Sequence, residues 1–340
     1  MTTPMAAPAV VGPKLKRATR PTEKLPQYLI DDASKVEKST FDASKHLNIA
    51  EPERIYTMKE IGLEGAGIST TAASAPFSLF TAEAVQQMRH ELFSQPVLES
   101  CQYTSDFAKN MIRGFGPALA PFIFDAWHSP EVLNAVSKIA GVDLVPALDF
   151  EVGHINISIN ATSTEIVQNK DGNYSKSDDM SAFAWHRDSY PFVCVTMLSD
   201  CTGMVGGETA MRTGSGEVMK VRGPTMGTAV VMQGRYIEHQ ALKALGGRER
   251  ISMVTAFRPK SVLVKDEIVL TGPRPISNLP ELYGQYSQYR FEVLEERIRN
   301  ELKKMRDRER SKRQFDTAAM RDFIADQKQY LEAMLLELVD

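Results

Sequence analysis

The sequence predicts an α+β fold in which a β-rich core lies between two helical regions, and three features of the chain indicate it. Apolar residues recur at helical steps of three and four from about 78 to 141. Short runs rich in Val, Ile, Thr and Phe, separated by Gly, Asp, Asn and Ser, fill 142–262. A second helical pattern follows Pro280. Many short strands at close spacing are typical of a sandwich or a barrel.

The composition indicates a globular protein with a sizeable core. The chain has 340 residues, of which 43% are hydrophobic and 24% charged. Its formal net charge of −3 gives no global electrostatic reason to expect nucleic acid or an anionic membrane as a partner. No apolar run approaches the roughly 20 residues of a membrane helix, and the N-terminus lacks the layout of a secretory signal. Three cysteines without a CxxC pair favour free thiols, so we expect a cytoplasmic protein.

The first 141 residues divide into an arm and a helical region. Residues 1–25 are rich in Pro, Thr, Ala, Lys and Arg without apolar periodicity, which predicts a flexible N-terminal arm. We expect 26–141 to be mostly helical. Thr81 is a suitable N-cap for one helix, Ser129-Pro130 has the sequence of a helix start, and Gly141 favours a helix end.

The region 142–262 is expected to hold the β core. The long polar stretch 161–181 interrupts it, and loops of this length inside a compact domain are often lids or binding loops. Apolar runs bounded by turn residues predict strands at about 144–151, 153–160, 182–187, 191–199, 207–212, 217–222, 227–233, 237–242 and 250–258.

The C-terminal region, 263–340, is expected to be helical. An apolar stripe with charges on the other faces runs from Leu282 to Met305, and a last helix carries apolar residues from Met320 to Leu338. The charges are mixed in sign, which disfavours a helix lying on a membrane surface. The stripes need a partner surface, either the β core or a second subunit, so a homodimer through the C-terminal helices is an expectation to test.

Two of the six histidines stand in a pattern that suits a metal ion. His186 and Asp188 lie two residues apart at the end of a strand-like run, so in an extended chain they project to the same face. Fifty residues lie between Asp188 and His239, and a rolled sheet can bring the two ends together. Two imidazoles and one carboxylate form the facial triad of non-haem iron(II) oxygenases, which leaves coordination positions open for reactants.

Arg250 and Ser252 supply a candidate anion site. They follow His239 closely and share parity, so both face the barrel interior if their segment is a strand. A guanidinium buried there needs an anionic partner, and its fork geometry suits a carboxylate. Two rival arginines are weaker candidates, because Arg248 stands at a Gly-Gly turn and Arg258 lies about 26 Å along the strand from Arg250.

The series HxD, about fifty residues, His, ten residues and Arg-x-Ser resembles the signature of the iron(II)/2-oxoglutarate-dependent dioxygenases. The segments TMGTAVVMQGRYIEHQ and RISMVTAFRP look like that family's strand before the distal histidine and its last core strand. The resemblance covers 142–262 and implies a double-stranded β-helix (jelly-roll) core, buttressed by the N- and C-terminal helices. It also implies that Fe(II) is held by His186, Asp188 and His239. Arg250 with Ser252 would hold the co-substrate 2-oxoglutarate, and O2 would be the oxidant.

The same resemblance sets expectations for the reaction. It implies a dioxygenase that oxidises a small molecule by hydrogen abstraction, with hydroxylation, desaturation or oxidative ring closure as the outcome. The flanking parts look like the fungal secondary-metabolism branch of the family, in which one group closes an aziridine ring on valine. An amino-acid-like substrate is therefore a hypothesis for this chain.

Several alternatives stay open at this point. Asn156 hydrogen-bonds the 2-oxo acid in one interpretation, and in the other it shares a solvated sheet face with His154. His154 could also be a further metal ligand. The chain as a whole could be a cupin-like metal dioxygenase that uses no 2-oxoglutarate, or a non-catalytic scaffold that acts through its C-terminal helices.

Overall fold

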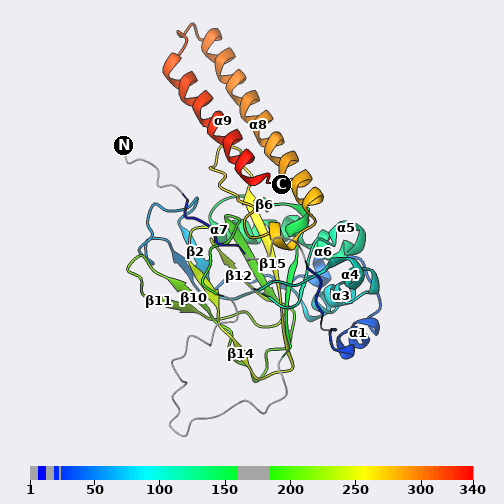
Figure 1. The fold of residues 1–340 in the computed structure, drawn as a ribbon. Helices are drawn as coiled ribbons and strands as arrows, with labels where there is room; N and C mark the ends of the chain where they lie inside the picture. The colour runs from blue at the N-terminus through cyan, green and yellow to red at the C-terminus, as the bar shows by residue number, and fades with distance from the viewer. Residues whose placement is uncertain (1–6, 13–18, 23, 107, 160–183, 340) are drawn as a thin grey trace.

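The molecule has a β core in its middle, with helices of the N-terminal region packed at one side and two long C-terminal helices projecting away from it (Figure 1). The fold class is α+β, as predicted from the sequence. The computed structural model describes residues 7–12, 19–22, 24–106, 108–159 and 184–339.

A large antiparallel sheet forms one wall of the core. Its central strands, in spatial order, are β12 (Thr228–Met232), β8 (Phe192–Met197), β15 (Glu249–Pro259) and β7 (His154–Ile159). β15 pairs with β8 on one side and with β7 on the other. Strands that are distant in sequence are therefore direct neighbours in the sheet.

A smaller antiparallel sheet forms the facing wall. It contains β11 (Val218–Val221), β10 (Thr209–Arg212) and β13 (His239–Ala241), and His186 extends it through a bridge to His239. Side chains of both sheets line one cavity, so the sheets face each other across it. From β7 onward the chain crosses repeatedly between the two sheets, which is the double-stranded β-helix (jelly-roll) arrangement. A further pair, β9 (Val205–Gly206) and β14 (Ala244–Leu245), joins the loops at one end.

β15 shows why the large sheet has two unlike faces. Successive residues of a strand point to opposite sides, so Ile251, Met253 and Phe257 enter the apolar cluster beneath the helices. Arg250 and Ser252 have the other parity, and both line the cavity between the sheets, as the sequence pattern predicts.

Helices cover the outer face of the large sheet. Trp127 of α6 (Pro121–His128) is fully buried, and its indole ring meets Phe257 of β15 at a centroid distance of 5.9 Å. The indole N–H also points at the sulfur of Met253, 3.1 Å away. α3 (Ala82–Leu92) and α7 (Pro130–Ala140) add their apolar faces to the same cluster. The remaining helices of this region are α1 (Gln27–Ser34), α2 (Ala43–His46), α4 (Gln95–Cys101) and α5 (Gly116–Leu119).

The predicted helix ends are confirmed. The Thr81 hydroxyl accepts a hydrogen bond from the amide of Ala84 and begins α3. Ser129 caps α7 in the same way and is followed by proline, which fits the first turn of a helix. Gly141 ends α7 with φ of 69°, a left-handed conformation that favours glycine.

The region 26–141 differs from its expectation, because it also contributes strands. β1 (Ile55–Thr57), β2 (Thr71–Ser74) and β3 (Phe77–Ser78) extend the large sheet beyond β12, while β5 (Met111–Ile112) and β4 (Gln102–Tyr103) extend it beyond β7. These strands have two to four residues, too few to show an alternating pattern.

The strand predicted over 144–151 is also wrong in its second half. It ends with β6 (Leu144–Pro146), and a 3-10 turn, η1 (Asp149–Glu151), follows. The carbonyl of Asp149 accepts the amide of Val152 in this turn. The turn places Glu151 inside the molecule, where it is 5% exposed.

The described parts of the N-terminal arm lie against the body of the molecule. The Arg20 guanidinium donates to the carbonyls of Ser100 and Gln102 at 2.8 and 2.9 Å. The Pro8 carbonyl accepts a hydrogen bond from the side chain of Arg235. These contacts hold two points of the arm, and the rest of residues 1–25 is described only in part.

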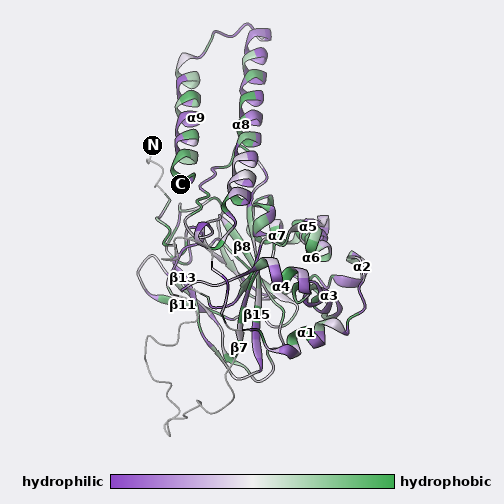
Figure 2. Cartoon of the chain, turned by 45° about the vertical axis from the view of Figure 1, so that its right-hand side comes forward, coloured by the Kyte–Doolittle hydropathy of each residue, from purple (hydrophilic) through white to green (hydrophobic). Residues whose placement is uncertain are grey.

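The C-terminal region forms a helical hairpin of α8 (Leu279–Arg310) and α9 (Thr317–Glu337), preceded by a 3-10 turn, η3 (Arg274–Ile276). At the base of the hairpin, Tyr286 and Tyr289 are buried against the core. Further out, apolar residues of the predicted stripe are exposed, with Leu302 at 45%. Figure 2 shows hydrophobic and hydrophilic residues mixed along both projecting helices.

Two findings concern the expectations about membrane helices and cysteines. Within its described part, no helix combines the length and the apolar character needed to cross a membrane. The thiols of Cys101, Cys194 and Cys201 are free.

Candidate metal centre

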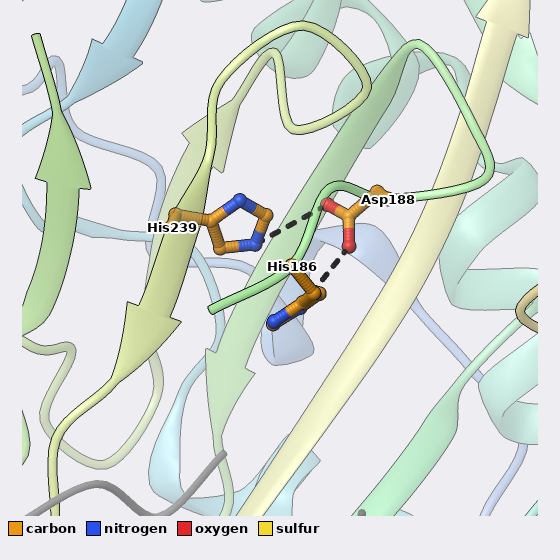
Figure 3. A group of neighbouring side chains, drawn as sticks. All are labelled: His186, Asp188 and His239. Atoms are coloured by element: carbon orange, nitrogen blue, oxygen red, sulfur yellow. Dashed lines mark ion pairs between the residues drawn. The ribbon is translucent and has the colours of Figure 1, made fainter. Parts of the chain in front are cut away.

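The three predicted metal ligands lie next to one another (Figure 3), and all three line the cavity between the sheets. His186 and His239 exchange two backbone hydrogen bonds of 2.9 Å, so the strand segments that carry them are paired directly. Asp188 comes two residues after His186, and its amide donates to the carbonyl of Gly234 at 3.0 Å. The fifty intervening residues run through β8, β10, β11 and β12 and return to the same place.

The ligand atoms lie close enough to share one cation. One carboxylate oxygen of Asp188 is 3.6 Å from Nε2 of His186, and the other is 3.7 Å from Nε2 of His239. One ligand atom from each residue can be chosen so that all three lie within 4.8 Å of one another. Two neutral nitrogens and one anionic oxygen on the same side of an ion make the donor set of a facial triad.

Backbone carbonyls orient both imidazole rings for this role. Nδ1 of His186 is 2.8 Å from the carbonyl oxygen of Ala184, and Nδ1 of His239 is 2.9 Å from that of Ile237. A carbonyl oxygen can only accept, so the proton of each neutral ring is on Nδ1. This tautomer leaves the lone pair of Nε2 directed toward Asp188, and a metal-binding histidine is commonly held in this way.

The burial of the triad favours a bound cation over a proton. His239 is 6% exposed, and this burial lowers the pKa of its imidazole to about 4, although the Asp188 carboxylate acts in the opposite direction. The ring is therefore neutral and available as a ligand at neutral pH. Oδ2 of Asp188 is buried without a hydrogen-bond partner among the described residues. A buried carboxylate oxygen needs compensation, which a metal ion would supply.

Gly234 makes room for the carboxylate. A Cβ atom built on Gly234 would lie 1.8 Å from Oδ2 of Asp188, so no side chain can occupy this position without moving the ligand. Gly234 lies in the segment that resembles the family's strand before the distal histidine, and the sequence predicts no role for it. Its role depends on a contact with a residue 46 positions earlier, which no local pattern reveals.

Arg250 and Ser252 line the same cavity and are 8% and 3% exposed. Burial lowers the pKa of the Arg250 guanidinium, which still keeps its positive charge. No acidic side chain in the described part of the chain forms an ion pair with it. A buried guanidinium without a counter-charge is costly, so this end of the cavity suits a ligand carboxylate.

The rival arginines lie elsewhere. Arg248 stacks on the ring of Tyr28 and pairs with Asp32 at 3.8 Å, while Arg258 stacks on Tyr289 of α8. Asn156 of β7 lines the cavity beside Ser252, its partner residue on β15. The cavity that Arg250 and the triad line has a volume of about 220 Å³.

A second polar group in this cavity was not predicted. Arg113 and Glu151, which are 1% and 5% exposed, form an ion pair, and Nη1 of Arg113 lies 3.3 Å from Nδ1 of His154. Tyr190 also lines this part of the cavity, and burial together with the Glu151 charge raises the pKa of its hydroxyl well above the usual value. The sequence signal was the parity that His154 shares with Asn156. Arg113 stands 41 residues from His154, with no motif to connect them.

The arm contributes to the wall near this group. Val10 and Val11 line the cavity, and the backbone of Gly12 packs so closely on the carbonyl of Thr271 that an added Cβ would lie 2.2 Å from its oxygen. The loop 161–181, predicted as a lid or binding loop, lies outside the described residues.

Comparison with known proteins gives weak similarities only. No family model and no curated protein matches the sequence. Among solved structures, prolyl 4-hydroxylases from Phytophthora capsici align over 93% of this chain and 98% of theirs, with a TM-score of 0.37 and 12% identity.

Two bacterial structures are similar at the same level. A Pseudomonas putida prolyl-4-hydroxylase aligns over 56% of this chain and 92% of its own, with a TM-score of 0.31 and 16% identity. An oxidoreductase of the 2OG-Fe(II) oxygenase family from Burkholderia pseudomallei aligns over 44% of this chain and 65% of its own, with a TM-score of 0.31 and 14% identity. These values are low, and we base no conclusion about activity on them.

Proposed function

We propose that this chain is a non-haem iron(II) dioxygenase that consumes 2-oxoglutarate and oxidises a small molecule. One observation carries the proposal: a cluster of two imidazoles and one carboxylate lines the same cavity as a buried arginine, Arg250. The cluster offers a cation site and the arginine offers a carboxylate site. A bidentate oxo acid that ends in a second carboxylate is the kind of molecule that satisfies both.

In this proposal each residue has a defined task. His186, Asp188 and His239 would hold Fe(II) through Nε2, a carboxylate oxygen and Nε2, beside the cavity that all three residues line. Arg250 and Ser252 bind the far carboxylate of 2-oxoglutarate, and Asn156 hydrogen-bonds the oxo acid nearer the metal. The bound iron, with 2-oxoglutarate and O2, would supply the oxidising power. The protein positions the reactants and keeps water out.

The substrate in this proposal is an amino-acid-like small molecule such as valine, as in the fungal secondary-metabolism enzymes that the sequence resembles. The volume of about 220 Å³ supports a small substrate, because 2-oxoglutarate must share the same space. Hydroxylation, desaturation and ring closure all begin with removal of one hydrogen atom, so all three are outcomes to look for in the products.

Anaerobic titration with Fe(II), followed by assay of succinate release, tests the proposal. We expect one Fe(II) per chain, and substrate-dependent succinate from at least one member of a panel of free amino acids. Arg250→Leu should raise the KM for 2-oxoglutarate at least about tenfold, since a charged hydrogen-bonding partner is lost. Arg248→Leu is the matched control, because this nearby arginine is 60% exposed at its side chain and stacks outside the cavity.

Two results would favour the alternatives. Turnover without 2-oxoglutarate, or full activity in Arg250→Leu, would indicate a cupin-like metal dioxygenase on the same type of barrel. Failure of the chain to bind Fe(II) at all would leave a scaffold whose function lies in its C-terminal helices.

We also propose a homodimer through the C-terminal hairpin. Ile298, Leu302 and Met305 of α8 are 43%, 45% and 38% exposed, and Ile324 and Leu331 of α9 are 58% and 40% exposed. Two antiparallel helices with outward apolar residues resemble one half of a four-helix bundle. Charged residues of the helices form local ion pairs, such as Arg299 with Glu295 at 2.6 Å on α8. The same face of a second copy would therefore encounter little net charge.

A further inference from the structure

The buried group around Arg113 (Arg113, Glu151 and His154) has no task in the reaction described above. It lines the cavity that also holds the triad and Arg250. Burial raises the pKa of Glu151, and the Asp188 charge acts in the same direction, whereas the Arg113 charge lowers it. Burial and the adjacent Arg113 charge keep His154 neutral, because both lower the pKa of its imidazole well below the usual value.

The contact with Arg113 fixes which nitrogen of His154 carries the proton. An arginine side chain has only donors, so Nδ1 of His154 must be the acceptor in the 3.3 Å contact with Nη1. The neutral ring then carries its proton on Nε2. This is the reverse of the triad histidines, whose Nδ1 atoms face carbonyls. His154 lines the cavity and carries its N–H on Nε2, so the metal-ligand alternative for it is disfavoured.

This donor is buried and has no partner in the described part of the chain. Nε2 of His154 and Nε of Arg113 are both without a hydrogen bond there. Buried polar atoms nearly always have a partner, so two neighbouring orphan donors beside a cavity indicate a place for a ligand acceptor. Glu151 already compensates the charge of Arg113, so a full negative charge on the ligand is not required.

The position of His154 along the sheet separates this place from the co-substrate end. His154 pairs across from Val254, whereas Arg250 pairs across from Ser158. The two levels are four residues apart along the strand, or about 13 Å. Apolar side chains, including Met111, Val193 and Ile276, line the cavity as well.

We propose that His154, positioned by Arg113 and Glu151, binds a carbonyl or carboxylate oxygen of the primary substrate, with the apolar body of that substrate lying on the surrounding wall. This inference rests on the proposed function, because it takes the triad end of the cavity to be the site of oxidation. It names the substrate class as a small apolar molecule with one oxygen acceptor, and it makes His154 a specificity-determining residue.

Two substitutions of similar size separate the donor from the volume of the ring. His154→Gln can keep an N–H donor toward the cavity while its amide oxygen accepts from Arg113. His154→Met fills similar space without a donor. The protein is loaded with Zn(II), which has no redox chemistry, and with 2-oxoglutarate. The probes are isobutyrate, isobutyramide and isobutylamine, which share a branched apolar body and differ in the acceptor oxygen.

Nuclear magnetic resonance of protein labelled with 15N at its histidines gives the readout. We expect His154 to be neutral with its proton on Nε2, and its Nε2 signal to move with isobutyrate and isobutyramide but not with isobutylamine. His154→Met should weaken isobutyrate binding about tenfold or more, and His154→Gln should stay within about threefold of the parent chain. The affinity for 2-oxoglutarate, measured by calorimetry, should be equal in all three.

Several results would overturn the inference. A proton on Nδ1 of His154, absence of any shift with both oxygen-bearing probes, or equal isobutyrate binding in His154→Met would each do so. A weaker affinity for 2-oxoglutarate in His154→Met would assign the donor to the co-substrate instead. The same spectra test the proposed function separately. If the triad binds no metal, the His186 and His239 signals will not move when Zn(II) is added.

Discussion

At the scale of single residues, the candidate site depends on one position without a side chain and on which nitrogen of each histidine carries the proton. Gly234 has no side chain at the point where Oδ2 of Asp188 lies, and the two ligand histidines have their protons held away from the metal position by main-chain carbonyls. His154 has its proton on the other nitrogen because its neighbour is an arginine. The identity of one neighbouring atom thus decides whether a histidine is a ligand or a donor.

Gly234→Ala should weaken metal binding. The added Cβ would lie 1.8 Å from Oδ2 of Asp188, so the carboxylate must leave its position. We expect a loss of about 10- to 100-fold in Zn(II) affinity by calorimetric titration, comparable to the loss of a residue that orients a ligand. Gly284→Ala is the control, because no atom lies near a Cβ built there on α8. Equal affinity in the two variants would contradict the role given to Gly234.

His154 should make the stability of the metal-free protein fall in mild acid. Its folded pKa lies well below 6.5, so below pH 6.5 the unfolded chain binds a proton that the folded chain does not. Stability therefore rises with pH through this window. Urea unfolding at pH 7.5 and 5.5 should show a smaller difference in His154→Gln than in the parent chain. An unchanged difference would mean that the ring is protonated in the folded state.

At the scale of elements, the strands that carry His239 and Arg250 were predictable, and the ones that widen the sheet were not. The strand predicted over 182–187 is wrong in its described part, 184–187, where His186 forms a single bridge to His239 and no strand. The alternation along 250–258 places Arg250 and Ser252 on one face, and the local residues suffice to predict this. β2 (Thr71–Ser74) reads TAAS and becomes a strand only through pairing with β12 and β1. The Arg113 group likewise depends on contacts across 38 and 41 residues, so its members could be seen singly but not as a cluster.

α8 should depend strongly on one buried arginine at its base. Arg290 is 1% exposed, pairs with Asp266 at 3.3 Å and donates to the carbonyl of Tyr330 in α9 at 2.8 Å. Arg290→Ala leaves Asp266 buried without its partner, so we expect a loss of about 3–5 kcal/mol in the free energy of unfolding. Arg299→Ala, on the same helix but in an exposed pair with Glu295, should change it by less than about 1 kcal/mol. Chemical denaturation of both variants measures the difference, and similar losses would refute the assignment.

At the scale of the whole molecule, a barrel that contains the candidate site carries a hairpin that points away from it (Figure 1). The base of the hairpin belongs to the apolar cluster that includes Val193 and Ala256, whose side chains also reach the cavity. The distal part touches solvent on its apolar side. The candidate site and the exposed hairpin surface can therefore be mutated separately.

Ile298→Glu combined with Leu302→Glu should convert a dimer into a monomer. Both side chains are exposed on one face of α8, so charge there opposes burial against a second copy and leaves the folded chain intact. Light scattering should give twice the chain mass for the parent protein and the single chain mass for the variant. Lys303→Glu, on another face, should remain dimeric. A monomeric parent protein would remove the dimer proposal without affecting the metal site.

The paired hydrogen bonds between His186 and His239 have a consequence for folding. A slip of one residue in this pairing would turn one imidazole to the opposite side of the sheet and separate it from Asp188. High affinity for the metal ion therefore requires the correct register between these two segments. During refolding, the fraction of molecules that bind Zn(II) would therefore equal the fraction in which these two distant segments are paired in the correct register.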